Sequence, residues 1–135
     1  WRLSEREAHQ TRFQAILRRC RSQAAENPWG FAHYLTVAGL SLMPALDLTL
    51  VGDPGNPRMK ELLAEIYRRF LPERRLVVKN PRDLARVEEL APAAKYYEPV
   101  DTGPVAYLCH HFTCQPPTGD PKELAAKLEV KPSTT

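Results

Sequence analysis

The sequence predicts an α/β fold in which a small, mostly parallel sheet of about three strands is flanked by helices and preceded by two amphipathic helices. Two observations predict this class. Near Ala45 the spacing of apolar residues changes from a helical repeat to strict alternation. Beyond that point, short apolar runs typical of strands are separated by single helical segments, an order that indicates crossovers between parallel strands.

Residues 1–44 are predicted to form a helical lead-in of two helices. In residues 3–25, apolar side chains recur at helical spacing on one face, opposite a face of arginine and glutamine. The apolar positions are Phe13, Ile16, Leu17, Cys20 and Ala24. A second helix is expected to begin at Asn27-Pro28, because a capping residue followed by proline favours a helix start, and to end at Gly39 and Pro44.

Residues 45–130 are predicted to form the α/β domain. Alternating leucines indicate a strand over residues 45–51, and further strands are expected at residues 76–78 and 105–109. Helices are expected to begin at the later cap-and-proline pairs, which lie at positions 56, 80 and 120. Their inward side chains are predicted to be Met59, Leu62, Leu63, Ile66, Phe70, Leu84, Val87, Leu90, Leu124 and Leu128. Residues 131–135 are polar, and we expect a disordered tail there.

Composition argues against two classes of partner. The chain has 19 basic and 16 acidic residues and a formal charge of +3, which is weak for a nucleic-acid binder. No apolar run approaches the roughly 20 residues that cross a bilayer. We therefore expect no nucleic acid and no membrane among the partners. Three unevenly spaced cysteines fit a reducing cytoplasm better than the disulfide framework of a secreted domain.

The loop formed by Gly52, Asp53, Pro54, Gly55 and Asn56 follows a predicted strand and precedes a predicted helix, which is where doubly wound proteins bind ligands. The loop has neither the three-glycine dinucleotide spacing nor the Gly-Lys-Ser/Thr of a P-loop. We interpret it as a structural turn, with binding of a sugar or nucleotide as an alternative.

Reactive side chains concentrate in residues 109–114, which read CHHFTC. A zinc site lacks a second ligand pair, since Cys20 and His33 are the only further candidates. The spacing of Cys109 and Cys114 is not that of a Cys-x-x-Cys redox motif, although a bridge closing this loop is an alternative. The favoured interpretation is that both cysteines serve packing. His9 and His33 are isolated, and no nucleophile and base are nominated together, so we predict no catalytic residue, cofactor or metal.

Three blocks of sequence carry a family resemblance. They are residues 48–53 (LTLVGD), residues 70–77 (FLPERRLV), and residues 105–109 (VAYLC) continuing through 114–117 (CQPP) to 120–124 (DPKEL). Together they resemble the C-terminal end of the spermatogenesis-associated, thioredoxin-domain-containing protein family over residues 46–129. The last block is the most specific, and the leading helices match more loosely.

The resemblance implies a parent protein of three parts: a thioredoxin-like domain, a helical barrel similar to six-hairpin glycosidases, and this α/β region. Residues 1–44 would then be the last hairpin of the barrel. The upstream domains of the same polypeptide would be the partners, and any redox or sugar-active chemistry would lie in them. Only Cys109 and Cys114 match family positions with potential chemistry.

These observations predict a non-catalytic structural domain that stabilises or completes the barrel. The first alternative is a thiol-redox switch or thioredoxin-linked regulatory module at Cys109 and Cys114, and the second is binding of a sugar or nucleotide at Gly52 to Asn56. We also expect an exposed apolar face on the first two helices, or self-association that covers it, because so small a sheet does not offer enough surface to bury it.

Overall fold

The computed structural model describes residues 3–110 and 113–129. The chain divides into two compact units, residues 1–43 and residues 44–135. The division lies beside the change of hydrophobic spacing near Ala45. The predicted disordered tail falls outside the described residues.

The first unit is a pair of helices, α1 (Glu7–Glu26) and α2 (Ala32–Leu42). The turn between them is held by the Asn27 side chain, whose Oδ1 accepts a hydrogen bond from the Gly30 amide at 3.1 Å. The predicted start of the second helix is wrong, because α2 begins at Ala32. The helix ends at Leu42, just before Pro44 as predicted, but it continues through Gly39. Asn27 stabilises a turn in place of a helix start, and a single glycine costs a helix only about 1 kcal/mol. Tyr34 joins the helices by donating a hydrogen bond to the Leu17 carbonyl at 2.7 Å.

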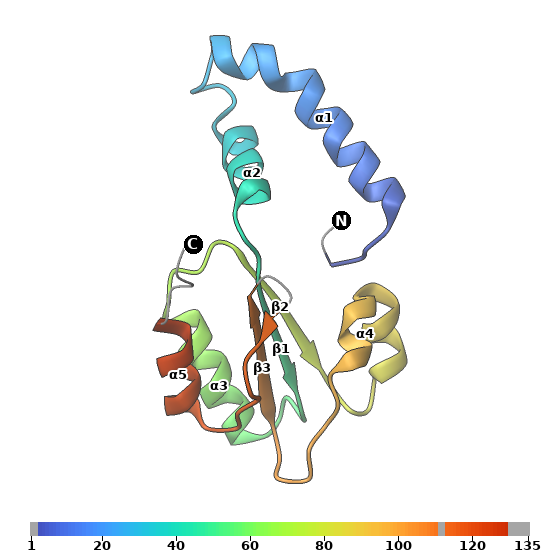
Figure 1. Ribbon diagram of the computed structural model, residues 1–135, viewed down its shortest axis with the longest axis vertical. Helices are drawn as coiled ribbons and strands as arrows, with labels where there is room; N and C mark the ends of the chain where they lie inside the picture. The colour runs from blue at the N-terminus through green and yellow to red at the C-terminus, as the bar shows by residue number, and fades with distance from the viewer. Residues whose placement is uncertain (1–2, 111–112, 130–135) are drawn as a thin grey trace. The chain divides into compact units, whose positions relative to one another are not determined.

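The second unit contains a mixed sheet with the order β2-β1-β3-β4 within the described residues. Its strands are β1 (Leu46–Val51), β2 (Arg74–Lys79), β3 (Val105–His110) and β4 (Thr113–Cys114). The α/β class with flanking helices is confirmed (Figure 1). β1 and β2 run parallel, as predicted, whereas β3 runs antiparallel to both β1 and β4. The prediction of a mostly parallel sheet is therefore wrong for β3.

The segment between β2 and β3, residues 80–104, leaves and re-enters the sheet at the same end, so β3 runs antiparallel to β1. β2 ends at Lys79 and β3 begins at Val105, and both residues lie beside Val51 at the same end of β1. Helix α4 (Leu84–Leu90) has seven residues and spans about 10 Å, whereas a six-residue strand spans about 20 Å. The 3-10 helix η1 (Pro92–Tyr96) and a turn then return the chain to the end that it left.

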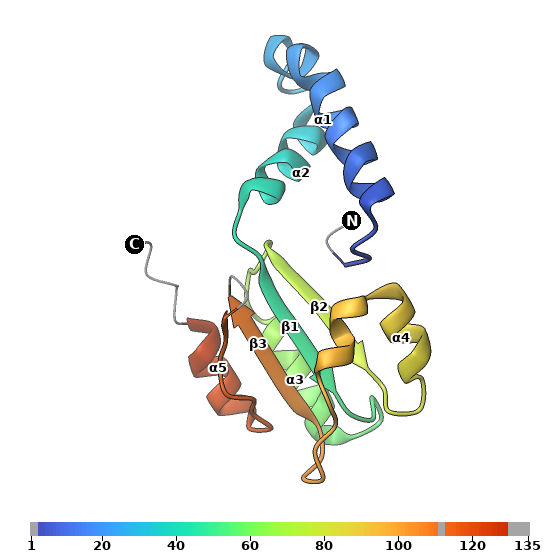
Figure 2. The ribbon, with the colours of Figure 1, turned by 45° about the vertical axis from the view of Figure 1, so that its right-hand side comes forward.

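The main core lies between one face of the sheet and two helices, α3 (Pro57–Tyr67) and α5 (Pro121–Glu129). Figure 2 shows these helices on one side of the sheet and α4 on the other. The buried cluster comprises Leu46, Leu48, Leu50, Met59, Leu62, Ile66, Ala106, Leu108 and Leu124. Two predicted core residues are wrong, because Phe70 is 91% exposed and Leu90 is also exposed. Phe70 lies beyond the end of α3, and Leu90 is the last residue of α4.

No helix in residues 3–110 and 113–129 combines the length and the apolar character that a bilayer crossing requires.

Candidate functional site

A disulfide joins Cys109 and Cys114 across the short antiparallel pair β3 and β4. The interpretation of the two cysteines as unlinked packing residues is therefore wrong, although the predicted burial of Cys109 is confirmed at 2% exposed. The pairing of β3 with β4 places Cys109 directly opposite Cys114, so the disulfide links two residues that the strand register already holds side by side. Cys114 is exposed. His111 of the intervening segment lies outside the described residues.

Cys109 has a polar neighbour on the face of the sheet opposite the main core. The hydroxyl oxygen of Tyr97 lies 3.3 Å from Cys109 Sγ. The Tyr97 ring packs against Tyr107 at 4.9 Å between centroids, and Tyr107 in turn donates a hydrogen bond to the Glu98 carbonyl at 2.8 Å. Burial, followed by the nearby Asp47 carboxylate, raises the pKa of Tyr97, and Arg75 opposes this. Tyr97 therefore keeps its proton as a hydrogen-bond donor.

A charged pair lies beside this sulfur. Asp47 on β1 is the register partner of both Cys109 on β3 and Arg75 on β2, and its carboxylate forms an ion pair with the Arg75 guanidinium. Sequence reasoning placed Asp47 on the face opposite the leucines but did not connect it with Cys109. The connection depends on the register between strands that lie about 60 residues apart, which alternation within one strand does not report.

Lys79 places a buried cation on the same face, with a side chain only 3% exposed. Its Nζ donates to the carbonyls of Ala94 and Tyr97, both at 2.9 Å, and lies 2.8 Å from Glu88 Oε1. These contacts join β2 to η1 and thereby position the backbone of Tyr97. Sequence reasoning misses this role, because a lysine at a strand end is usually solvated.

The polar groups of the Gly52 to Asn56 loop bind one another and the helix that follows. Asp53 Oδ1 accepts from the Gly55 amide at 2.8 Å, and Asn56 Oδ1 accepts from the Arg58 amide at 2.9 Å. Gly52 has a φ of 153°, and a Cβ there would lie 2.9 Å from Pro104 Cα. These contacts account for the loop as a turn and a helix cap. Ligand binding there stays a prediction.

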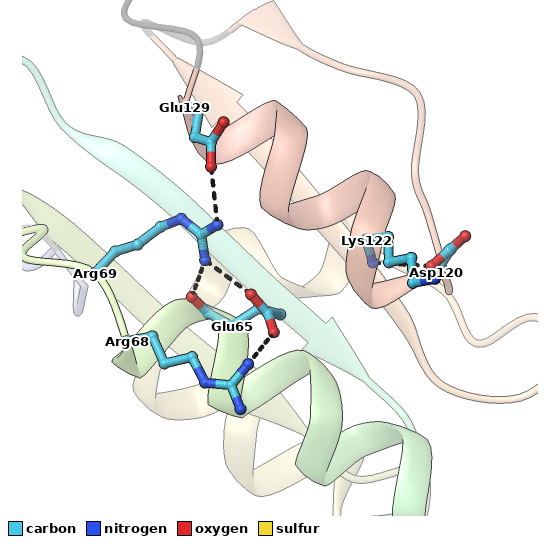
Figure 3. A network of polar contacts seen from close by, with 6 residues as sticks. All are labelled: Glu65, Arg68, Arg69, Asp120, Lys122 and Glu129. Carbon is cyan, nitrogen blue, oxygen red and sulfur yellow. Dashed lines mark hydrogen bonds and ion pairs between the residues drawn. The ribbon is translucent and has the colours of Figure 1, made fainter.

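A cavity of about 330 Å³ lies between α3 and α5 and is lined by Glu61, Ala64, Glu65, Arg68, Asp120, Pro121 and Lys122. Figure 3 shows the Glu65 carboxylate between Arg68 and Arg69, with Glu129 of α5 reaching Arg69. The ion pairs measure 2.6 Å from Arg68 to Glu65 and 3.0 Å from Arg69 to Glu65. Together with the ion pair from Arg69 to Glu129, these contacts join the C-terminal end of α3 to α5.

The network at Glu65 predicts a dependence of stability on pH. The hydrogen bond from Arg69, together with the charges of Arg68 and Arg69, lowers the pKa of Glu65 below 4.5 against a smaller opposing effect of burial. A carboxylate with a lowered folded-state pKa contributes stability above its unfolded pKa and loses it as the pH falls through the folded value.

We therefore expect the free energy of unfolding of Glu65→Gln to fall less than that of the unsubstituted chain between about pH 5 and pH 3. Urea unfolding at both pH values measures this difference, and Glu61→Gln on the same helix is the control. An equal loss in the unsubstituted chain and in Glu65→Gln would contradict the prediction.

No cluster of three or more metal-ligating side chains occurs in the part of the chain that the structure describes. Cys20 is a free thiol on α1, and His9 lies 2.9 Å from the Ser4 hydroxyl. Among residues 3–110 and 113–129, neither belongs to a group of candidate metal ligands. Comparison with family models, with curated proteins and with solved structures found no match to this chain.

Proposed function

We propose that this chain is a non-catalytic accessory unit, whose α1 and α2 pack their apolar side chains on another protein surface. The observation that carries the proposal is that α1 and α2 leave most of their side chains unburied. Among its described residues only Ala24 is buried, whereas Ile16 is 53% exposed and Leu42 is 86% exposed. Exposed apolar faces of this kind mark surfaces that bind a partner.

The energetics favour a partner for these helices. An isolated helix gains little from intrinsic propensity and depends on packing of its apolar face. Each large apolar side chain that moves from water into a contact contributes about 1.5–3 kcal/mol. The family resemblance supports the helical barrel of the same polypeptide as the surface on which the helices pack. The alternative is that two copies of the chain associate through these helices.

Hydrogen exchange on the full chain tests the proposal. We expect amides of α1 and α2 to exchange at least about 100-fold faster than those of β1, because the helices lack tertiary protection. Sedimentation over a range of concentrations then reports self-association, and Ile16→Asp is expected to weaken any dimer while Lys60→Asp, on α3, leaves it unchanged. A concentration-independent monomer whose α1 exchanges as slowly as β1 would contradict the proposal.

A second function has a specific observation in its favour, which is the Cys109–Cys114 bridge with one exposed partner. We propose that this bridge is a reversible thiol switch. Reduction would release β4 from the constraint that holds it beside β3, since β4 has only two residues. A disulfide that is open to attack exchanges with dithiol reductants more readily than a buried one.

Alkylation read by mass spectrometry tests the switch. The chain has three cysteines, and Cys20 is the free one, so we expect one alkyl group without reductant and three after dithiothreitol. Removal of the reductant in air should restore the singly alkylated state. Three alkyl groups without reductant, or a bridge that resists dithiothreitol in the folded protein, would count against the switch.

A further inference from the structure

The two cysteines of the bridge differ in exposure. Cys114 is exposed on the edge strand β4, whereas Cys109 is 2% exposed on β3. An external thiolate must approach a disulfide sulfur directly, so access selects which sulfur is attacked and which one leaves. The fold therefore offers Cys114 to a reductant and keeps Cys109 away from it.

The sulfur that would leave has a hydrogen-bond donor beside it. A bridged sulfur carries no hydrogen, so the 3.3 Å contact between Tyr97 and Cys109 is donated by the Tyr97 hydroxyl. A hydrogen bond to a thiolate is stronger than one to a neutral sulfur because the acceptor is charged. The Asp47 carboxylate on the neighbouring strand would repel a thiolate at Cys109, and its ion pair with Arg75 offsets that repulsion.

We infer that Cys109–Cys114 is a directional exchange site, in which a dithiol reductant attacks Cys114 and Tyr97 stabilises the departing Cys109 thiolate. This inference rests on the proposed thiol switch. It assigns separate roles to the two cysteines and makes Tyr97 a positioning residue for the leaving group.

Reduction of the bridge by a dithiol takes two exchange steps. One thiol of the reductant loses its proton, and its sulfur bonds to Cys114 Sγ while the electron pair of the broken S–S bond goes to Cys109 Sγ. The second thiol of the reductant then loses its proton and attacks the reductant sulfur in the mixed disulfide, which releases Cys114 as a thiolate. The dithiol is oxidised by two electrons to its own disulfide. The bridge is reduced, and the two protons end on Cys109 and Cys114.

The position of the mixed disulfide tests the direction in the unsubstituted full chain. A brief reaction with reduced glutathione, quenched in acid, is expected to leave glutathione on Cys114, as read from fragment ions. Glutathione on Cys109, or spread equally over both cysteines, would overturn the direction even if the bridge is reversible. A bridge that never reduces would instead remove the switch itself.

The role of Tyr97 is tested with a matched pair of variants. Tyr97→Phe is expected to slow reduction by dithiothreitol about 3- to 10-fold at neutral pH, because it removes a hydrogen bond to a charged sulfur. Tyr96→Phe, which alters an exposed neighbouring ring, is expected to leave the rate unchanged. Equal rates for the two variants would overturn the assignment to Tyr97.

A titration separates this role from a loss of packing. In the full chain carrying Cys114→Ser and Cys20→Ser, thiolate absorbance reports the pKa of Cys109. Adding Tyr97→Phe is expected to raise that pKa, because the thiolate loses its donor. An unchanged pKa would show that Tyr97 does not stabilise the thiolate and would overturn its role.

Discussion

Replacing Leu62 with alanine is expected to lower the free energy of unfolding of the α/β unit by about 2–5 kcal/mol. Leu62 is fully buried on α3 and belongs to the cluster between this helix and the sheet. The substitution removes apolar contacts and leaves a cavity that the surrounding leucines fill only in part. The loss is large for a unit of this size, whose total stability is about 5–15 kcal/mol.

Urea unfolding followed by far-ultraviolet circular dichroism measures the effect of Leu62→Ala. Tryptophan fluorescence is unsuitable, because Trp1 and Trp29 both belong to the first unit. Glu61→Ala is the matched control, since it alters an exposed neighbour on the same helix, and we expect a change within about 0.5 kcal/mol. A loss below about 1 kcal/mol for Leu62→Ala would contradict the packing of α3 on the sheet.

The helix starts show how far local sequence determined the fold. All four predicted starts have a capping residue followed by proline, yet only Asn56 and Asp120 lie directly before a helix, each accepting a hydrogen bond from the amide two residues on. Asn80 accepts the same bond from Arg82, and α4 begins four residues later. Met59 is buried in the first turn of α3 and Leu124 in the first turn of α5, whereas none of the four residues after Asn27 or after Asn80 is buried. Tertiary burial of the first turn thus decides where a local cap becomes a helix start.

The strands show what alternation alone predicts. The face of β1 that carries Leu46, Leu48 and Leu50 was readable from the sequence, because period two is a local property, and these leucines are buried as predicted. The direction of β3 was not readable, since it depends on the path of α4 and η1 between distant strands. The two-residue β4 was missed for a related reason, because it has no periodicity and exists through its pairing with β3.

The same limit applies to the candidate site. The sequence singles out Cys109 and Cys114 as the reactive pair, but it does not favour a disulfide between them, because the strand register that places them opposite each other is not a local property. No sequence pattern points to Tyr97, because it lies in the irregular segment after η1 and reaches Cys109 only through the fold. Residues in loops acquire roles from the scaffold that positions them, which no local pattern reports.

Lys79→Met is expected to destabilise the α/β unit by about 3 kcal/mol, because it removes the cation from a buried set of partners. The Ala94 and Tyr97 carbonyls would lose the ammonium donor, and Ala94 would keep only its bond from the Tyr97 amide. Glu88, whose side chain is 35% exposed, can be rehydrated. Methionine keeps most of the apolar stem, so the effect reports the lost polar contacts and not a cavity.

Urea unfolding measures the loss for Lys79→Met, and Lys60→Met on the exposed face of α3 is the control, with an expected change within about 0.5 kcal/mol. Hydrogen exchange adds a local test. The amides of Ala94 and Tyr97, which bond to the carbonyls of Ala91 and Ala94, should exchange faster in Lys79→Met. Because Lys79 holds the backbone of Tyr97, the same variant is also expected to slow reduction of the Cys109–Cys114 bridge. Equal stability of Lys79→Met and Lys60→Met would mean that the buried ammonium does not hold η1 against the sheet.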